Sequence, residues 1–381
     1  MISKTYNPSV AGIYIHVPFC VMKCPYCDFY SVEGVQRQNS FVQAVQLEAE
    51  KRAYELEGLK IQSVYFGGGT PSLLSHFEVA EILNKLRACY DFQEDVEITM
   101  ECNPGDISQM EIGKHISNGV NRFSMGAQSF QPHLLEFLGR RHGAEDTQRM
   151  YGYFRTLGVD NISMDLIYGI PGETMADLEA DLEQLVELNP EHISTYHLIY
   201  EEGTPMTQAR DRGEFQEVEE ELSIEMADLI RQKLLSAGYE HYEISNFAKP
   251  GKRSRHNSAY WEGVPYIGLG PSAHSYRHPW RSHNPSSIVE YNKQLRWEPG
   301  FLDRIFERIT PEIEFEEYLL TRLRTREGIS LIEIKEMGHE LDPKLVDEMT
   351  EKGWLAKQGD RLHLTERGIT LSDAIILHLS L

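Results

Sequence analysis

The sequence predicts an α/β fold built on a parallel sheet or barrel, followed by a small helical module. Six short β-rich runs alternate with helix-like stretches in the first half of the chain, which is the pattern of repeated βα units. These runs are Gly12–Val17, Ser63–Gly67, Val96–Cys102, Arg122–Gln128, Asn161–Gly169 and His192–Tyr200. At 381 residues, the chain suits one large domain with one or two small ones.

The stretches between these runs carry helix-boundary signals. Asp106 is placed to cap a helix that ends at Gly119, and Thr174 with Asp177 approximates a capping box. The helix that starts at Thr174 is expected to stop before Asn189-Pro190.

Polar residues follow the predicted strands at the point where each one ends. Right-handed crossovers bring the carboxyl ends of parallel strands to one edge, where α/β folds bind their ligands. The residues expected there are Gly67–Gly69 and Thr70 after the second strand, Glu101 on the third, Gln128 on the fourth and Asp165 on the fifth. A ligand explains these side chains better than packing does.

After Tyr200 the pattern changes. Glu214–Arg231 predicts one exposed helix, and Gly238–Ala248 predicts a strand. From about Phe301 the chain becomes a small module whose final hairpin resembles that of winged helices. We therefore expect three regions: a barrel in residues 1–235, a connecting region in 236–300 and a helical, winged-helix-like domain in 301–381.

Composition narrows the function classes. The net charge of -22 disfavours nucleic acid and anionic membrane surfaces as partners, leaving at most peripheral membrane contact. Five cysteines, sparse and odd in number, indicate a reducing compartment, and no signal-like or membrane-spanning apolar stretch occurs, so we expect a cytoplasmic protein. One basic island, Lys249–His256, opposes the overall charge.

Three of the cysteines, Cys20, Cys24 and Cys27, lie within eight residues after the first strand. With His16 they could bind a structural zinc ion. Alternatively, three thiolates could hold an iron–sulfur cubane whose fourth iron stays open to a chelating ligand. The spacing alone leaves both interpretations open, but the polar strand ends around the loop favour the second. Cys89 and Cys102 are expected to be small apolar fillers.

The Cys-x3-Cys-x2-Cys loop, with Tyr26 before its last cysteine and a GGGTP stretch downstream, resembles the radical S-adenosylmethionine (SAM) superfamily. The resemblance implies a partial (β/α)6 barrel, a [4Fe-4S] cluster on the three cysteines, and SAM chelated to the fourth iron. Similarity to the oxygen-independent coproporphyrinogen III oxidase branch extends over nearly the whole chain. It implies SAM contacts from Tyr14, Tyr26, Gly68, Gly69, Thr70, Glu101, Gln128, Arg140 and Asp165.

Two subfamilies share that branch. The true oxidase carries a fourth cysteine two residues after the third and a long N-terminal extension, whereas this chain has Phe29 at that position and only 13 residues before Tyr14. The HemW-type heme chaperones are marked by H-N-x-x-Y-W, and this chain has that motif at His256–Trp261.

The heme-chaperone resemblance implies heme with His256 as an axial ligand, transfer of heme to respiratory acceptor proteins, and a homodimer. We add the hypothesis that Arg253 and Arg255 pair with the heme propionates. The alternative is a porphyrin-biosynthesis enzyme that decarboxylates coproporphyrinogen III. The motifs do not decide whether SAM is cleaved. If the chain is an enzyme, it is expected to be a radical SAM oxidoreductase of the coproporphyrinogen III dehydrogenase type.

Overall fold

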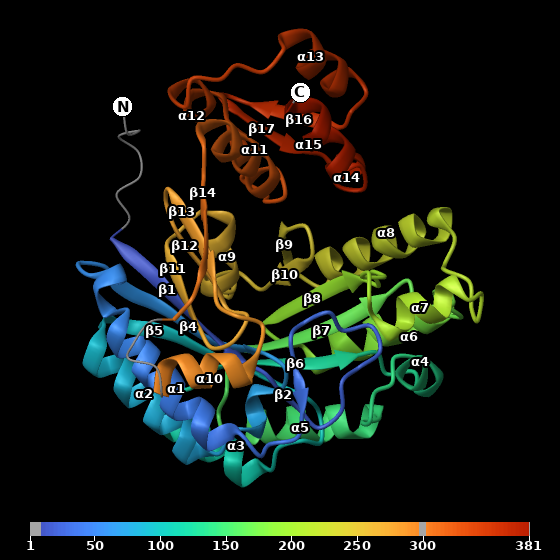
Figure 1. The fold of residues 1–381 in the computed structure, drawn as a ribbon. Helices are drawn as coiled ribbons and strands as arrows, with labels where there is room; N and C mark the ends of the chain where they lie inside the picture. Colours follow the sequence, from blue (N-terminus) through green and yellow to red (C-terminus); the bar gives the residue numbers. More distant parts are fainter. Residues whose placement is uncertain (1–8, 297–301, 381) are drawn as a thin grey trace.

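The computed structural model describes residues 9–296 and 302–380 and shows an α/β fold around one large mixed sheet (Figure 1). The sheet has 12 strands in the order β14-β13-β12-β11-β1-β4-β5-β6-β7-β8-β10-β9. Its two edge strands, β14 and β9, do not pair with each other among the described residues, so the sheet is an open, partial barrel.

The six predicted strands form the parallel centre of this sheet, as expected for βα repeats. They are β1 (Val10–Val17), β4 (Lys60–Gly68), β5 (Asp91–Cys102), β6 (Arg122–Gln128), β7 (Ile162–Tyr168) and β8 (His192–His197). Each pairs in parallel with the next one in the chain. The predicted partial (β/α)6 architecture is therefore confirmed.

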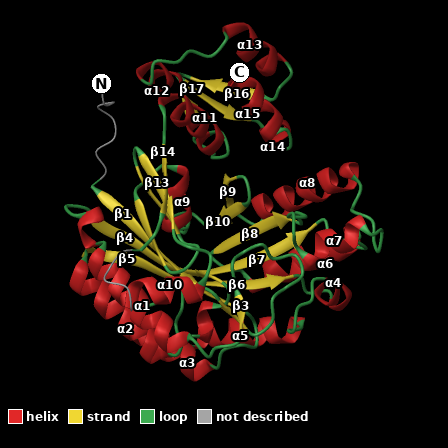
Figure 2. Cartoon of the chain, in the orientation of Figure 1, coloured by secondary structure: helices red, strands yellow, loops and turns green. Residues whose placement is uncertain are grey.

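Helices between the strands cover the outer, convex side of the sheet (Figure 2). They are α1 (Gln38–Lys51), α2 (His76–Cys89), α3 (Gln109–Ser117), α5 (Ala144–Thr156), α6 (Met175–Leu188) and α8 (Glu220–Ser236). The short helices α4 (Pro132–Phe137) and α7 (Pro205–Asp211) belong to a separate apolar cluster, against which Tyr26 of the cysteine loop packs. Two 3-10 turns, η1 (Ala53–Leu56) and η2 (Pro71–Leu73), complete this part of the chain.

The helix boundaries agree only partly with the predictions. The capping box of Thr174 and Asp177 is present, and α6 ends with Asn189 in the left-handed conformation. The predicted Asp106 cap is wrong: Ser108 caps α3, while Asp106 accepts a hydrogen bond from Arg141. The predicted exposed helix from Glu214 starts later, as α8, and buries one face.

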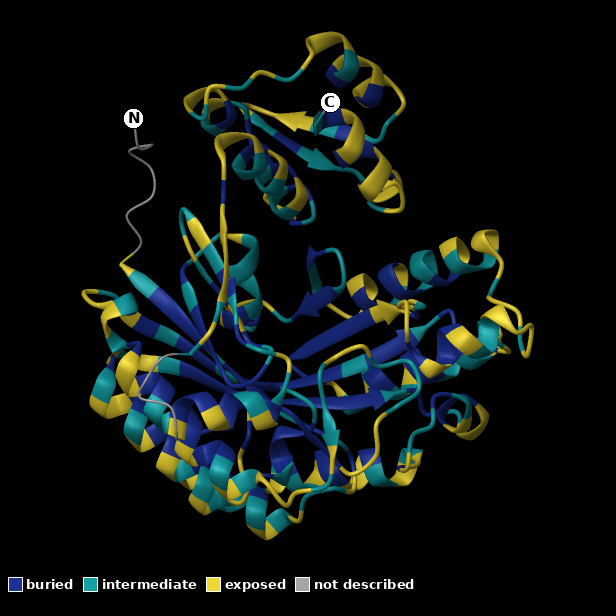
Figure 3. Cartoon of the chain, in the orientation of Figure 1, coloured by how far each residue is buried: buried dark blue, intermediate teal, exposed yellow. Residues whose placement is uncertain are grey.

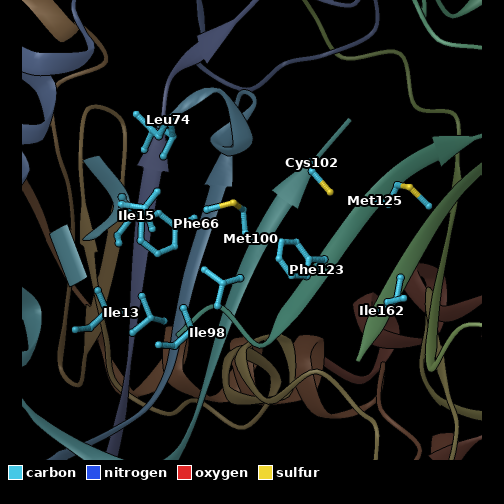
Figure 4. Close-up of a cluster of buried hydrophobic side chains, with 14 of the residues drawn as sticks. Ile13, Ile15, Phe66, Leu74, Ile98, Met100, Cys102, Phe123, Met125 and Ile162 are labelled. Carbon is cyan, nitrogen blue, oxygen red and sulfur yellow. The ribbon is translucent and has the colours of Figure 1, made fainter. Parts of the chain in front are cut away.

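The main core lies between the sheet and its helices (Figures 3 and 4). Alternation along β1 sends Ile13 and Ile15 into this core, so Tyr14 and His16 face the concave side. Cys102 is buried in the core and Cys89 packs against it, as expected of apolar fillers. The concave side is therefore left to polar and aromatic groups.

The region after α8 extends the sheet at both edges. The predicted strand at Gly238–Ala248 is a hairpin, β9 (Glu240–Glu243) and β10 (Asn246–Ala248), because a turn at Ile244-Ser245 interrupts it. The remaining elements are α9 (Arg255–Trp261), β11 (Tyr266–Leu269), β12 (His274–Arg277), β13 (Trp280–His283), α10 (Ile288–Arg296) and β14 (Ile305–Arg308). Since β11 pairs with β1, this region belongs to the barrel sheet. The division at 235 stays a prediction, and the boundary at 300/301 lies outside the described residues.

The C-terminal module stands above the sheet and is reached through β14 (Figure 1). It contains α11 (Pro311–Arg322), β15 (Ile329–Ser330), α12 (Leu331–Glu336), α13 (Pro343–Glu351), β16 (Leu355–Gln358), β17 (Arg361–Leu364), α14 (Glu366–Ile369) and α15 (Ser372–Ser380). Its predicted hairpin is β16–β17, and it has its own apolar core. Across residues 9–296 and 302–380, no helix is long and apolar enough to cross a membrane.

Candidate cluster and cofactor site

The cysteine loop leaves the carboxyl end of β1 and lies over the mouth of the barrel. A short parallel pair, β2 (Phe19–Cys20) and β3 (Val32–Glu33), closes its two ends. All three cysteines are free thiols. Thr70 Oγ1 donates to Cys20 Sγ at 3.8 Å, and Arg140 Nη1 donates to Cys24 Sγ at 3.4 Å.

These surroundings suit thiolate ligands of a cluster. Burial raises the pKa of the Cys20 and Cys27 thiols, and hydrogen-bond donors act in the opposite direction. Within the described residues, no three His, Cys, Asp or Glu side chains converge to hold a single metal ion. A cubane is larger, because each thiolate binds a different iron. Three thiols on one loop are the donor set of a cubane with one open iron.

His16, the fourth donor in the zinc interpretation, is engaged elsewhere. Its Nδ1 lies 3.2 Å from the Tyr14 hydroxyl, and its Nε2 lies 2.7 Å from the Tyr30 carbonyl oxygen. Burial lowers the pKa of this imidazole, which keeps it neutral. His16 thus supports the chain around the loop, and the zinc interpretation loses its fourth ligand.

The glycines after β4 allow the backbone to approach its neighbours closely. A Cβ at Gly68, where φ is +109°, would lie 2.7 Å from the His16 ring, and one at Gly69 would lie 2.6 Å from the Phe19 carbonyl oxygen. Any side chain at these two positions would displace the cysteine loop. The GGG sequence therefore holds the loop against the strand ends.

Glu101 is the central carboxylate of the concave side. It accepts hydrogen bonds from the Tyr65 hydroxyl at 2.8 Å and from the Gly68 backbone N–H at 3.1 Å. Burial is the largest influence and raises the pKa of Glu101 to about 7. Near neutral pH this carboxyl therefore exchanges between an acceptor-only and a donor-capable form.

Two further predicted residues face the same interior. Asp165 accepts from Ser124 Oγ at 3.3 Å, and burial raises its pKa. Gln128 has a left-handed backbone, with φ of 65°, and its buried Oε1 has no hydrogen-bond partner among the described residues. An unpaired buried acceptor is costly, so a ligand that donates a hydrogen bond there would be stabilised.

Arg140 links the cysteine loop to the strand ends. Its Nη2 donates to Asn103 Oδ1 at 2.6 Å and to the Gly126 carbonyl at 3.0 Å, and its Nη1 lies 3.4 Å from the Tyr26 hydroxyl. A cavity of about 20 Å³ lies beside Arg140, Cys24 and Thr70. The guanidinium therefore lies at the cysteine loop, and its predicted contact with the SAM carboxylate stays a prediction.

His256 lies in the barrel interior, beneath the tyrosines of this site. It is 2% exposed, and its ring stacks on Tyr65 with centroids 5.0 Å apart. Nδ1 lies 2.9 Å from Ser63 Oγ and Nε2 lies 3.0 Å from the Tyr260 hydroxyl. Both ring nitrogens of the predicted heme ligand therefore have partners inside the protein.

The basic island is neutralised by acidic side chains. Arg253 forms ion pairs with Glu240 at 3.3 Å and Glu327 at 2.7 Å, and Arg255 pairs with Asp95 at 2.8 Å. Both guanidinium groups already have carboxylate partners, so a heme propionate would have to displace these exposed pairs, and our hypothesis that they bind heme propionates stays a prediction.

Sequence reasoning missed three residues of the site. Asn103 bridges Arg140 and Thr70, donating to Thr70 Oγ1 at 3.0 Å, while Tyr65 and Ser124 bond to Glu101 and Asp165. Tyr65 lies two residues before Gly67, so strand alternation could have placed it on the same face. Asn103 directly follows the third predicted strand, so the rule that identified the other residues at strand ends could also have found it.

Comparison with known proteins identifies the family and agrees with the fold. The model of the Radical SAM superfamily matches residues 14–185, and that of the HemN C-terminal domain matches residues 309–371. Heme chaperone HemW from Bacillus subtilis is 32% identical over 369 residues, covering 95% of this chain and 97% of that protein. Heme chaperone HemW from Escherichia coli is 32% identical over 366 residues, with 94% of both chains covered.

The solved structure of coproporphyrinogen III oxidase (HemN) from Escherichia coli has the same fold. Its TM-score is 0.83 at 22% identity, covering 99% of this chain and 92% of that one. The cysteine loop and barrel thus define a member of the radical SAM superfamily. Within it, the chain belongs to the family of proteins named heme chaperone HemW.

Proposed function

We propose that this protein is a heme chaperone that binds heme, carries a [4Fe-4S] cluster with exchangeable SAM, and transfers heme to acceptor proteins. The observation that carries the proposal is the identity of about one third, over nearly the full length, with HemW proteins of distantly related bacteria. The H-N-x-x-Y-W motif and Phe29, where the oxidase subfamily has a cysteine, support the same choice.

We assign the cluster to the three loop cysteines and SAM to the groups around them. When bound, the cluster would supply an electron and one iron open to chelation by SAM. Glu101, Asp165 and Gln128 provide acceptors for hydroxyl and amino groups, and Arg140 provides a cation for a carboxylate. Gly68, Gly69, Thr70, Tyr14 and Tyr26 shape the pocket. The proposal also includes respiratory proteins as the heme acceptors, a homodimeric state and a cytoplasmic location.

SAM binding is expected to strengthen as pH rises from about 6 to about 8. The raised pKa of Glu101, about 7, means that the carboxyl is protonated at the lower pH and becomes a full acceptor for the ribose hydroxyls only above it. Glu101→Gln is expected to weaken SAM binding about tenfold at high pH and to flatten this dependence. Calorimetric titration of SAM into the anaerobically reconstituted protein measures both effects.

Glu81→Gln is a matched control, because Glu81 is an exposed glutamate of α2, a helix that packs on the convex side of the sheet. It should retain the wild-type pH profile. An unchanged profile in Glu101→Gln would show that this carboxylate does not contact SAM.

The proposed function is tested in two parallel anaerobic reactions. In the first, ferric heme is added and the heme absorption spectrum is followed. In the second, coproporphyrinogen III, SAM and reductant are added and loss of carboxyl mass is followed. We expect stoichiometric heme binding and an unchanged porphyrinogen. The Escherichia coli oxidase serves as the positive control, and decarboxylation without heme binding would overturn the proposal in favour of the oxidase.

A further inference from the structure

The internal bonds of His256 raise the question of which imidazole can bind heme iron. An axial ligand must offer a ring nitrogen with a free lone pair to a large planar molecule. His256 is buried and both its nitrogens have partners, so it meets neither condition in this fold. Another histidine on an accessible face is needed.

The antiparallel edge of the sheet presents two histidines on the concave side. His274 on β12 pairs directly with His283 on β13, and their rings stack with centroids 5.1 Å apart. His274 is exposed and His283 is half-buried. The pair therefore forms one accessible imidazole surface.

Register places this pair beside the SAM pocket. Tyr14 on β1 pairs with Gly268 on β11, and the antiparallel pairing of β11 with β12 puts Gly268 opposite His274. Two strand spacings separate Tyr14 from His274, a distance of about 10 Å. Alternation along β12 shows which face His274 occupies. The hydroxyl of the next residue, Ser275, accepts a hydrogen bond from Arg52 on the convex side, so His274 faces the concave side.

The contacts of His283 prepare it as a ligand. Its Nδ1 lies 3.3 Å from the carbonyl oxygen of Asn284, an acceptor that selects the tautomer with the proton on Nδ1. The lone pair is then on Nε2. A carbonyl oxygen that accepts from the other ring nitrogen orients many metal-binding imidazoles in this way. Because stacked rings this close cannot hold an iron between them, one ring binds and the other supports it.

The neighbours of the pair suit a porphyrin. Ile305 on β14 lies opposite His283 in the same row and is 63% exposed, which offers apolar surface to the macrocycle. In the next row, Tyr276 stacks on Tyr266 with centroids 6.2 Å apart. Arg281 forms ion pairs with Glu307 and Glu317, so its guanidinium group is already neutralised within the protein.

We propose that His283 Nε2 is the axial ligand of heme iron, and that His274 positions its ring, at the concave face of β12–β14. This assignment rests on the proposed heme-chaperone function. It places the heme at the rim of the barrel beside the SAM pocket, with His256 as an interior residue that orders Tyr65 and Tyr260 below it.

The test uses ferric heme and the full chain. Optical and electron paramagnetic resonance spectra are recorded for the wild type, for His283→Ala, for the double variant His274→Ala/His283→Ala and for His256→Gln. The double variant is expected to lose the histidine-ligated spectrum and to bind heme at least about tenfold more weakly. His133→Ala is the matched control, because His133 is an exposed histidine on the distant helix α4. Circular dichroism and SAM affinity check that the fold and the cofactor pocket are retained.

The outcomes separate the site from the function. A double variant that binds heme with the wild-type spectrum and affinity overturns the site and leaves the chaperone proposal standing. Loss of ligation in His256→Gln, with the double variant unaffected, overturns it in favour of the motif histidine. If the wild type binds no heme, the proposed function itself fails.

Discussion

Cys24→Ala is expected to abolish cluster assembly and, with it, SAM binding. Three thiolates are the minimum that holds a cubane with one open iron, so the loss of one leaves two ligands. Cys24 also receives the hydrogen bond from Arg140, and the substitution releases this guanidinium from the loop. Iron and sulfide analysis of the reconstituted protein, together with SAM titration, measures both losses. We expect near-zero cluster content and no saturable SAM binding.

The chain offers a matched control for this experiment. Cys89 is also a free thiol, but it lies at the end of α2, packed against the core and remote from the loop. Cys89→Ala should assemble a full cluster and bind SAM as the wild type does. If Cys24→Ala retained four irons and wild-type SAM affinity, the three-cysteine assignment would be wrong.

The parallel centre of the fold could be predicted because short, continuous stretches of sequence encode its strands and helix caps. Each of the six strands is a short β-rich run, and the capping box at Thr174 and Asp177 is encoded within four residues. The Asp106 cap failed because Ser108, two residues on, competes for the same role, and nearby Arg141 gives Asp106 a different partner. Such competition is settled by tertiary contacts.

The site was predictable where a residue follows a strand, and less so where its role depends on a distant partner. Glu101 and Asp165 were found from their positions at strand ends. Asn103 was not, because its function is to connect Thr70 and Arg140, which are far apart in the sequence. The pairing of Arg253 with Glu240 and Glu327 was likewise invisible, since three separate segments meet there.

One buried polar network connects α1 to the extension of the sheet by β11–β14. Glu48 of α1 is fully buried and accepts from Arg52, from the Tyr291 hydroxyl at 2.5 Å and from the Gly270 N–H at 2.9 Å. Arg52 in turn donates to the Gly268 carbonyl at 2.8 Å. No sequence pattern shows that a helix glutamate joins strands more than two hundred residues away.

Arg52→Met is expected to destabilise the protein by about 3–5 kcal/mol, because removing one partner of a buried ion pair leaves the other uncompensated. Here Glu48 would lose its cationic partner in a site that is 0% exposed. Urea unfolding followed by fluorescence measures the loss as a lower midpoint. Hydrogen exchange should locate the earliest opening in β11 and α10, which the network fastens to α1.

Lys85→Met is the control, because it removes one partner of a surface ion pair instead of a buried one. Lys85 pairs with Glu50 at 2.8 Å, but both side chains are accessible to water, which weakens the pair. Its unfolding midpoint should stay close to that of the wild type. Equal, small effects of the two substitutions would mean that the Arg52 network contributes no more than a surface pair. The attachment of β11–β14, and with it the position of His274 and His283, would then depend on strand pairing and apolar packing alone.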